Sequence, residues 1–176
     1  IYPNRSYSTQ GNKAFKHIHI GDTRLITKFV EPDRRFEDRQ FYVHGDHLGS
    51  TGFVTDGAGK LYEHLNYFPS GETWVEETKD SGQPVPYQFT GKEIDPETGY
   101  YYYGSRYYDP RASMWQSPDP ALPTYLPNGM TRNAELPGFG GVFNTRNLNP
   151  YGYGLHNPVR YDDPDGGIVF IPVIIG

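Results

Sequence analysis

The stretch Gln88–Pro120, QFTGKEIDPETGYYYYGSRYYDPRASMWQSPDP, decides the fold class of this chain. Runs of tyrosine alternate in it with turns at Asp95-Pro-Glu-Thr-Gly99 and Asp109-Pro-Arg111. Tyrosine fits the half-buried surface of a β-strand, whereas Asp, Pro and Gly supply the backbone angles of tight turns. The stretch therefore predicts a repeat of short strands and turns, and its spacing does not indicate a catalytic motif.

The same hairpin pattern continues toward the N-terminus. Residues 16–30 alternate about a Gly21-Asp22 turn, residues 41–43 begin a further strand, and residues 52–62 form two β-prone runs joined by a glycine-rich turn. The polar segment 76–86 is predicted to be a loop. Turn signals recur roughly every ten to fifteen residues, which is typical of a sheet that grows hairpin by hairpin and packs aromatic side chains across its strands.

The composition supports an all-β protein. Its 16 tyrosines, ten phenylalanines, 21 glycines and 16 prolines among 176 residues favour strands and turns over long helices. The formal net charge is −5 and lysines and arginines form no dense cluster, which argues against nucleic acid as a partner. The chain has no cysteine and therefore no disulfide. Its longest apolar run, residues 168–175, is too short for a membrane-spanning helix, so we expect a soluble segment that does not contact a membrane.

The hairpin pattern fades after Pro118 into a segment that proline or glycine interrupts every few residues. We therefore predict three parts, namely hairpins over 1–116, a loop-rich plug over 117–167 and an apolar tail over 168–176. A loop-rich segment of this length is unusual in a compact domain unless it is functional or packed inside a larger assembly. Because the chain begins at Ile1 and ends within the apolar run, we expect it to be a fragment of a longer polypeptide.

Several phrases resemble the associated core of Rhs proteins, which are built of YD repeats, and are similar to the C component of Tc toxins. These phrases are HGDHLGST (44–51), FTGKEIDPETGYYYYGSRYYDP (89–110), SPDP (117–120) and NPVRYDDPDG (157–166). The resemblance implies a β-shell made of repeated hairpins that encloses a C-terminal toxin, with an inward plug at one end. Shells of this family are several times longer than this chain, so it would supply the last turns of the shell and the plug.

The resemblance also implies the biological setting. The function would be structural encapsulation within a secreted polymorphic toxin that is made in the bacterial cytoplasm, delivered outside the cell and used in interbacterial competition, with type VI secretion as one route. The partners would be the remainder of the shell, the C-terminal toxin domain and the delivery machinery. The apolar tail would be either the start of the variable effector or a strand that returns into the shell.

Many members of this family cut their own chain at a signature resembling P-x4-D-P-x-G-L, and two aspartates in Asp-Pro phrases are implicated. The matching positions here are Asp119 and Asp163, and the implied cut lies between Gly167 and Ile168. Gly167 stands where the signature has leucine, which is a departure at the cleaved position. The implied chemistry is aspartyl proteolysis, in which one carboxyl group holds a proton while the other is ionised and activates water.

Arg111 or Arg160 is predicted to support this pair of carboxyl groups. The chain would then be at most an intramolecular aspartyl autoprotease, either as a minor step or as its main role. Without the resemblance, Asp-Pro is a common way to start a turn and needs no catalytic explanation. A third alternative is a surface adhesion module that binds glycans through Tyr100–Tyr103 and Tyr107-Tyr108, although packing explains these tyrosines better.

Two groups of residues have the composition of metal sites, but we predict no metal and no cofactor. One group is histidine-rich, and within this family its residues are better explained as shell residues that hydrogen-bond across strands. The other is an acidic loop that lacks the downstream glutamate of a calcium site. The histidine-rich group comprises His17, His19, His44, Asp46 and His47, and the acidic loop comprises Asp162, Asp163, Asp165 and Gly166.

Overall fold

A computed structural model describes residues 6–10, 13–21, 23–30, 40–79, 84–125 and 149–167 of the chain. They form two compact units. The first contains the described residues up to 66 together with 73–91, and the second contains 67–72 together with the described residues from 92 onward. Strands dominate both units, and the longest helix in the described part is the single turn α1 (Leu122–Tyr125). The predicted all-β class is therefore confirmed.

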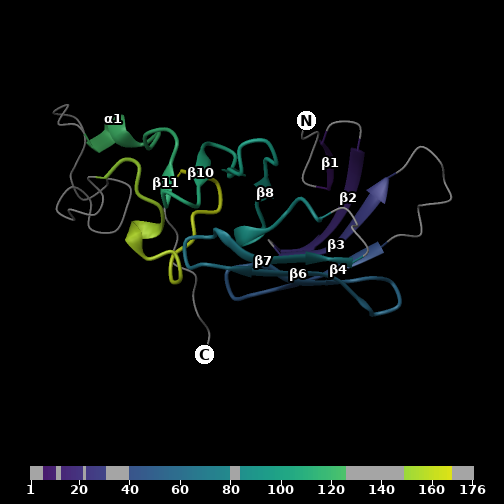
Figure 1. Ribbon diagram of the computed structural model, residues 1–176. Coiled ribbons are helices and arrows are strands. Elements are labelled where there is room, and N and C mark those ends of the chain that lie inside the picture. The colour runs from purple at the N-terminus through teal and green to yellow at the C-terminus, as the bar shows by residue number, and fades with distance from the viewer. Residues whose placement is uncertain are drawn as a thin grey trace. The chain divides into compact units, whose positions relative to one another are not determined.

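The first unit is a seven-stranded antiparallel sheet whose strand order follows the sequence. Its strands are β1 (Tyr7–Gln10), β2 (Lys13–Ile20), β3 (Thr23–Val30), β4 (Gln40–Gly45), β5 (Thr51–Thr55), β6 (Leu61–Tyr67) and β7 (Thr73–Thr78). The colours of these strands change gradually from purple at β1 to teal at β7 (Figure 1). Each strand thus pairs with the strands made just before and just after it, as a hairpin-by-hairpin sheet requires.

The turns that join β4 to β5 and β5 to β6 are built in the same way. The carboxylate of Asp46 accepts hydrogen bonds from the backbone N–H of Leu48 and Ser50, and that of Asp56 does the same two and four residues on. Each turn then needs a left-handed residue, which Gly49 (φ 79°) and Gly59 (φ 75°) provide. The phrase HGDHLGST is therefore a turn phrase in this fold.

An aromatic ladder crosses one face of the first sheet. The rings of Phe15 and Phe29 lie 5.0 Å apart, those of Phe29 and Phe41 5.1 Å, and those of Phe41 and Tyr62 4.2 Å. Val54 and Val85 complete the buried cluster around Phe41. Aromatic pairs of this kind contribute about 0.5–1.5 kcal/mol beyond the area that they bury. The predicted cross-strand packing of aromatic side chains is thus the core of this unit.

Two titratable groups are buried in the first unit. His17 lies between the hydroxyl groups of Ser8 and Thr27, at 3.0 and 3.2 Å, and burial lowers its pKa to about 3. Glu63 accepts a hydrogen bond from the backbone N–H of Val85 at 2.9 Å, and burial raises its pKa to about 7. Its second carboxyl oxygen, Oε1, has no hydrogen-bond partner among the described residues. Burial therefore extends the neutral form of His17 down to about pH 3 and the neutral form of Glu63 up to about pH 7.

The second unit contains a smaller antiparallel sheet of four short strands in the order β11-β10-β9-β8. The strands are β8 (Glu93–Ile94), β9 (Tyr101–Tyr102), β10 (Tyr107–Asp109) and β11 (Met114–Trp115). Its core is a cluster of four buried aromatic side chains, Tyr103, Tyr108, Trp115 and Tyr153. Tyr153 comes from the loop-rich segment, so that segment packs against the last strands of the hairpin repeat.

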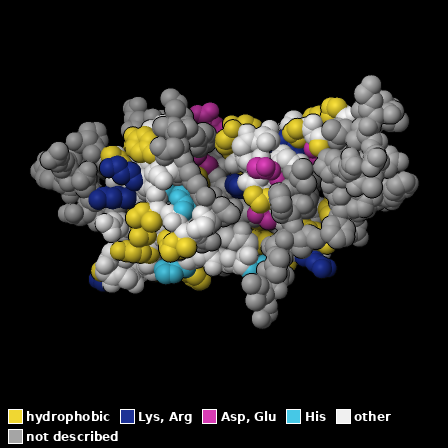
Figure 2. Space-filling model, turned by 180° about the vertical axis from the view of Figure 1, so that it is seen from behind, with side chains coloured by type: hydrophobic (Ala, Val, Ile, Leu, Met, Phe, Trp, Pro, Cys, Tyr) yellow, Lys and Arg dark blue, Asp and Glu magenta, His cyan; other side chains and the backbone are white. Residues whose placement is uncertain are grey.

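Hydrophobic side chains that remain exposed form several separate groups on the face shown in Figure 2. No helix in the described part of the chain is long and apolar enough to cross a bilayer. The division at residue 116 and the tail over 168–176 stay predictions, and the tail lies outside the described residues.

Candidate active site

The candidate site is centred on Arg106, which lies in the turn between β9 and β10. This turn is closed by a hydrogen bond of 3.0 Å from the N–H of Tyr103 to the carbonyl of Arg106. The side chain points into the second unit, where only 2% of it is exposed, and its guanidinium lies 4.2 Å from the ring of Trp115. A buried guanidinium is costly unless its charge and its N–H groups are matched.

The matching charges come from Asp119 and Asp163. The same nitrogen of Arg106, Nη2, lies 3.5 Å from a carboxylate oxygen of Asp119 and 3.2 Å from one of Asp163. The Asp163 side chain is completely buried, whereas 26% of the Asp119 side chain is exposed. Arg106 thus brings together the two aspartates that the family signature indicated.

Backbone pairing explains how Asp119 reaches this place. The N–H of Trp115 donates to the carbonyl of Tyr151 at 2.9 Å, and the N–H of Asp119 donates to the carbonyl of Pro150 at 2.8 Å. Segment 149–153 therefore runs beside β11 and the residues that follow it. Arg106 also donates to this carbonyl of Pro150, at 3.4 Å, so the same oxygen accepts from both Asp119 and Arg106.

Arg106 also contacts Gly167, which precedes the predicted cut, and its neighbour Gly166. Its Nε donates to the carbonyl of Gly166, and its Nη2 lies 3.4 Å from the carbonyl oxygen of Gly167. Gly166 has φ 73°, and a Cβ there would lie 3.1 Å from the backbone nitrogen of Arg106. A side chain at residue 166 is therefore disfavoured both by the backbone angle and by the tight contacts that its Cβ would make.

The electrostatics of Asp163 suit acid–base chemistry near neutral pH. Burial raises the pKa of Asp163 to about 7, Arg106 opposes this shift, and Asp165 adds to it. Burial likewise lowers the pKa of Arg106, while Asp119 and Asp163 raise it. At neutral pH the Asp163 carboxyl therefore exists in both its protonated and its ionised form, as a group that passes a proton must.

The loop that carries Asp163 is fixed by its neighbours. The N–H of Asp163 donates to Asp162 at 2.8 Å, and Asp162 accepts a further hydrogen bond from the hydroxyl of Tyr153 at 3.1 Å. Lys92 donates to the carbonyl of Pro164, and the N–H of Ser105 donates to the carbonyl of Asp165 at 3.0 Å. The signature is thus tied to Tyr153 of its own segment before Asp163, and to residues that flank the strands of the second unit after it.

The two arginines predicted as supports lie elsewhere. Arg111 is exposed, contacts Asp109 at 3.2 Å and donates to the carbonyl of Thr98. Arg160 is also exposed and lies 5.5 Å from the ring of Tyr161. Arg106 is the arginine that contacts both aspartates, and Ile168, on the far side of the implied cut, lies outside the described residues.

The tyrosines considered for sugar binding and the groups considered for metal binding have other contacts in the structure. Of the tyrosines considered for sugar binding, Tyr101, Tyr103 and Tyr108 are buried in the core, whereas Tyr107 is exposed. His44 lies 3.0 Å from the hydroxyl of Thr55 on the next strand. No group of three or more His, Cys, Asp or Glu side chains in the described segments is arranged to hold a metal ion.

Comparison with known proteins identifies the fold family. Residues 23–150 match the family described as the teneurin YD-shell. The chain is 30% identical over 165 residues to the tRNA3(Ser)-specific nuclease WapA of Bacillus spizizenii, covering 94% of this chain and 6% of that protein. It is 33% identical over 168 residues to the toxin subunit YenC1 of Yersinia entomophaga, covering 89% of this chain and 15% of that subunit.

A solved structure supports the same assignment. The crystal structure of TcdB2-TccC3-Cdc42 matches with a TM-score of 0.66 and 25% identity, covering 88% of this chain and 6% of that one. The chain therefore spans a small part of each of these proteins. The matched residues include the sheet of the first unit from β3 onward and the tyrosine strands of the second. The chain belongs to the YD-shell family of Rhs-type shell proteins.

Proposed function

We propose that this chain is the closing section of a β-shell that contains a toxin, and that it cuts itself after Gly167 to release the C-terminal effector inside the shell. Support for the first part comes from similarity to a toxin subunit and to a nuclease, both of which are much longer than the chain. We further propose that the assembled protein leaves the bacterial cell through a delivery machinery and acts on competing cells. Its partners are the rest of the shell and the effector.

The observation that carries the proposed cleavage is the single nitrogen of Arg106 that contacts Asp119, Asp163 and the carbonyl oxygen of Gly167. An N–H donor aimed at a carbonyl oxygen stabilises the negative charge that develops there when water attacks. Two carboxyl groups beside it supply a base and an acid, provided that one of them keeps its proton. The raised pKa of Asp163, about 7, makes Asp163 the group that keeps it.

The proposed reaction is hydrolysis of the peptide bond between Gly167 and Ile168. Asp119, in its ionised form, takes a proton from water as the water oxygen bonds to the carbonyl carbon of Gly167. Arg106 stabilises the resulting oxyanion. The bond to the nitrogen of Ile168 then breaks as Asp163 donates its proton to that nitrogen, which leaves a carboxyl group on Gly167 and a free amine on Ile168.

Intact mass of the full-length polypeptide that contains this chain tests the proposed cleavage. The wild type, Asp119→Asn and Asp163→Asn should be purified at neutral pH, because Asp-Pro bonds break in acid. We expect the wild type as two fragments with a new N-terminus at Ile168, and both variants as one uncut chain. An uncut wild type, or cutting that survives either substitution, would contradict the proposed site.

A matched control separates loss of chemistry from loss of fold. Asp109→Asn removes a carboxylate that contacts the exposed Arg111 and lies in another Asp-Pro turn. We expect this variant to be cut like the wild type.

Containment is tested separately by adding protease to the native protein, since an enclosed effector should survive while the same effector expressed alone is digested. Digestion of the effector in the native protein would contradict containment and would leave the cleavage result unchanged.

A further inference from the structure

Asp165 is the remaining acidic side chain at the candidate site, and neither the family signature nor the pair Asp119 and Asp163 gives it a role. We propose that Asp165 is a positioning residue for the cleavage, which holds the N–H of Gly167 and keeps the proton on Asp163. This inference rests on the proposed self-cleavage and adds a third carboxyl group to it.

The geometry places Asp165 between the proposed acid and the residue that is cut. The N–H of Gly167 lies 2.9 Å from Oδ1 of Asp165 and 3.1 Å from Oδ1 of Asp163, so the two carboxyl groups converge on one donor. Two carboxyl groups that meet in this way cannot both be ionised without strong repulsion. Because Asp163 is buried and Asp165 is exposed, the shared proton resides on Asp163.

The surroundings of Asp163 also favour a proton on Asp163 and a charge on Asp165. After burial and the opposing effect of Arg106, the charge of Asp165 and a hydrogen bond between the two side chains contribute to the raised pKa of Asp163. The only cation that pairs directly with Asp163 in the described part of the chain is Arg106, and it is shared with Asp119. The charged and titratable groups around Asp163 are Arg106, Asp119, Asp162, Asp165, Lys92 through the carbonyl of Pro164, and Tyr153 through Asp162.

Because Gly167 has no side chain, the carboxylate of Asp165 has space beside it. A Cβ built on Gly167 would lie 3.1 Å from Oδ1 and 3.6 Å from Cγ of Asp165, so a side chain at residue 167 would push the Asp165 carboxylate from its place. The backbone of Asp165 is held independently, because its carbonyl accepts the N–H of Ser105 at 3.0 Å. Substitution of the Asp165 side chain should therefore leave the loop folded and change only the carboxylate.

The test is the pH dependence of cleavage in the full-length polypeptide, made by cell-free synthesis and then shifted to buffers from about pH 5 to about pH 9. In the wild type we expect the rate to fall as the pH rises through about 7, where Asp163 loses its proton. Asp165→Asn keeps the acceptor for the Gly167 N–H but removes the charge. Its alkaline limb should move to lower pH by about one unit, so that cleavage at about pH 8 is about tenfold slower.

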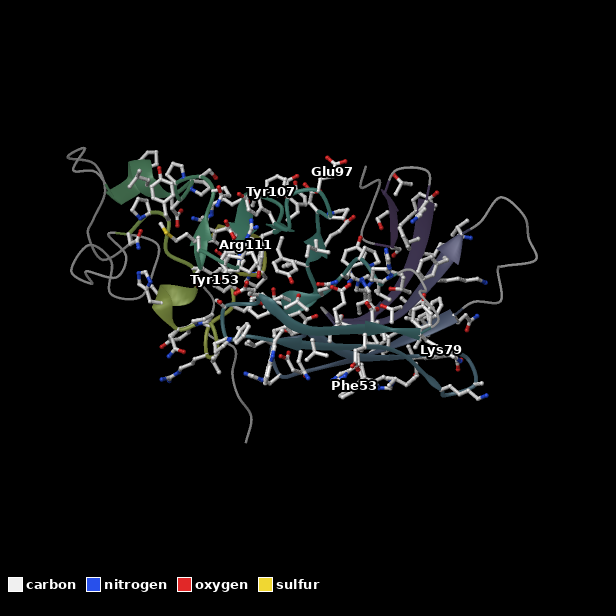
Figure 3. All side chains as sticks on the ribbon, in the orientation of Figure 1. Phe53, Lys79, Glu97, Tyr107, Arg111 and Tyr153 are labelled. Atoms are coloured by element: carbon white, nitrogen blue, oxygen red, sulfur yellow. The ribbon has the colours of Figure 1, made fainter. Side chains whose placement is uncertain are left out.

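Two further variants complete the test. Glu97→Gln removes an exposed carboxylate in another turn of the second unit, where its side chain points away from the ribbon (Figure 3), and should leave the profile unchanged. Asp165→Ala removes both the charge and the acceptor, and should slow cleavage at every pH. A cut wild type with the same profile in Asp165→Asn overturns the role of Asp165 alone. A wild type that stays uncut at every pH overturns both this role and the proposed cleavage.

Discussion

Replacing Arg106 with leucine should loosen the loop that carries the cleavage signature. Arg106 is the direct cationic partner of the completely buried Asp163, and it also donates to the carbonyl of Gly166. Removing one partner of a buried ion pair costs about 3–5 kcal/mol, because the other charge is left without compensation. The loss of the pair between Arg106 and Asp119 adds less to this cost, since 26% of the Asp119 side chain is exposed and water screens its charge.

Protonation of Asp163 reduces this cost in a pH-dependent way. Because its pKa is already raised to about 7, Asp163 takes up a proton when Arg106 is lost. We therefore expect Arg106→Leu to destabilise this loop by about 3 kcal/mol at pH 8, where protonation of Asp163 is itself unfavourable. At pH 5 we expect about 1–2 kcal/mol, because mainly hydrogen bonds are lost there. A change of 3 kcal/mol corresponds to an opening equilibrium that is about a hundredfold larger.

Hydrogen exchange followed by mass spectrometry of the full-length polypeptide measures this effect in peptides from residues 149–167. Rates are compared after correction for the intrinsic effect of pH on exchange. The control is Arg160→Leu, which removes an exposed arginine over Tyr161 and should change protection by less than about 0.5 kcal/mol. If Arg106→Leu changes protection no more than this control does, then Arg106 does not hold Asp163 in the folded protein.

Three predictions concern the first unit and use the same exchange measurement. Because the pKa of Glu63 is raised to about 7, its stabilising effect is lost as the pH rises through 7, and Glu63→Gln should increase protection of β6 at pH 8 by about 1–2 kcal/mol and little at pH 5. Because the pKa of His17 is lowered to about 3, stability should fall as the pH drops from 6.5 toward 3, and His17→Gln should remove this loss. Gly59→Ala, at φ 75°, should loosen its turn by about 1 kcal/mol. An unchanged pH profile in the first two variants, or unchanged protection in the third, would contradict them.

The fold class could be predicted from the sequence because the relevant signals are local. Alternation about Gly21 predicts β2 and β3, and the glycine-rich turn at residues 56–60 predicts β5 and β6, since a hairpin is specified by its own strands and its own turn. The predicted loop over 76–86 is wrong at its start, because β7 extends to Thr78. Two adjacent glutamates, Glu76 and Glu77, make this strand look like a polar loop in the sequence. Both are tolerated because β7 lies at the edge of the sheet.

The candidate site could be predicted only in part. The Asp-Pro phrases and the family resemblance indicated Asp119 and Asp163, and the structure places both on Arg106. Arg106 itself was missed because it stands inside a run of tyrosines, where local pattern indicates only a turn. Its partner Asp163 is 57 positions away, and no local pattern in one sequence reveals a contact of that range. The glycine that follows the tyrosines, Gly104, marks a tight turn but gives no sign that the next charged side chain points inward.

The strand order of both sheets has a consequence for synthesis on the ribosome. Since every strand after the first in each sheet pairs with the strand that precedes it, each hairpin can add to the growing sheet as soon as it leaves the exit tunnel. The contacts of Arg106 with residues 163–167 are different, because they wait for the last described segment to emerge. The proposed cut would therefore be timed by translation itself, and the small sheet of the second unit would be in place before the bond after Gly167 becomes a substrate.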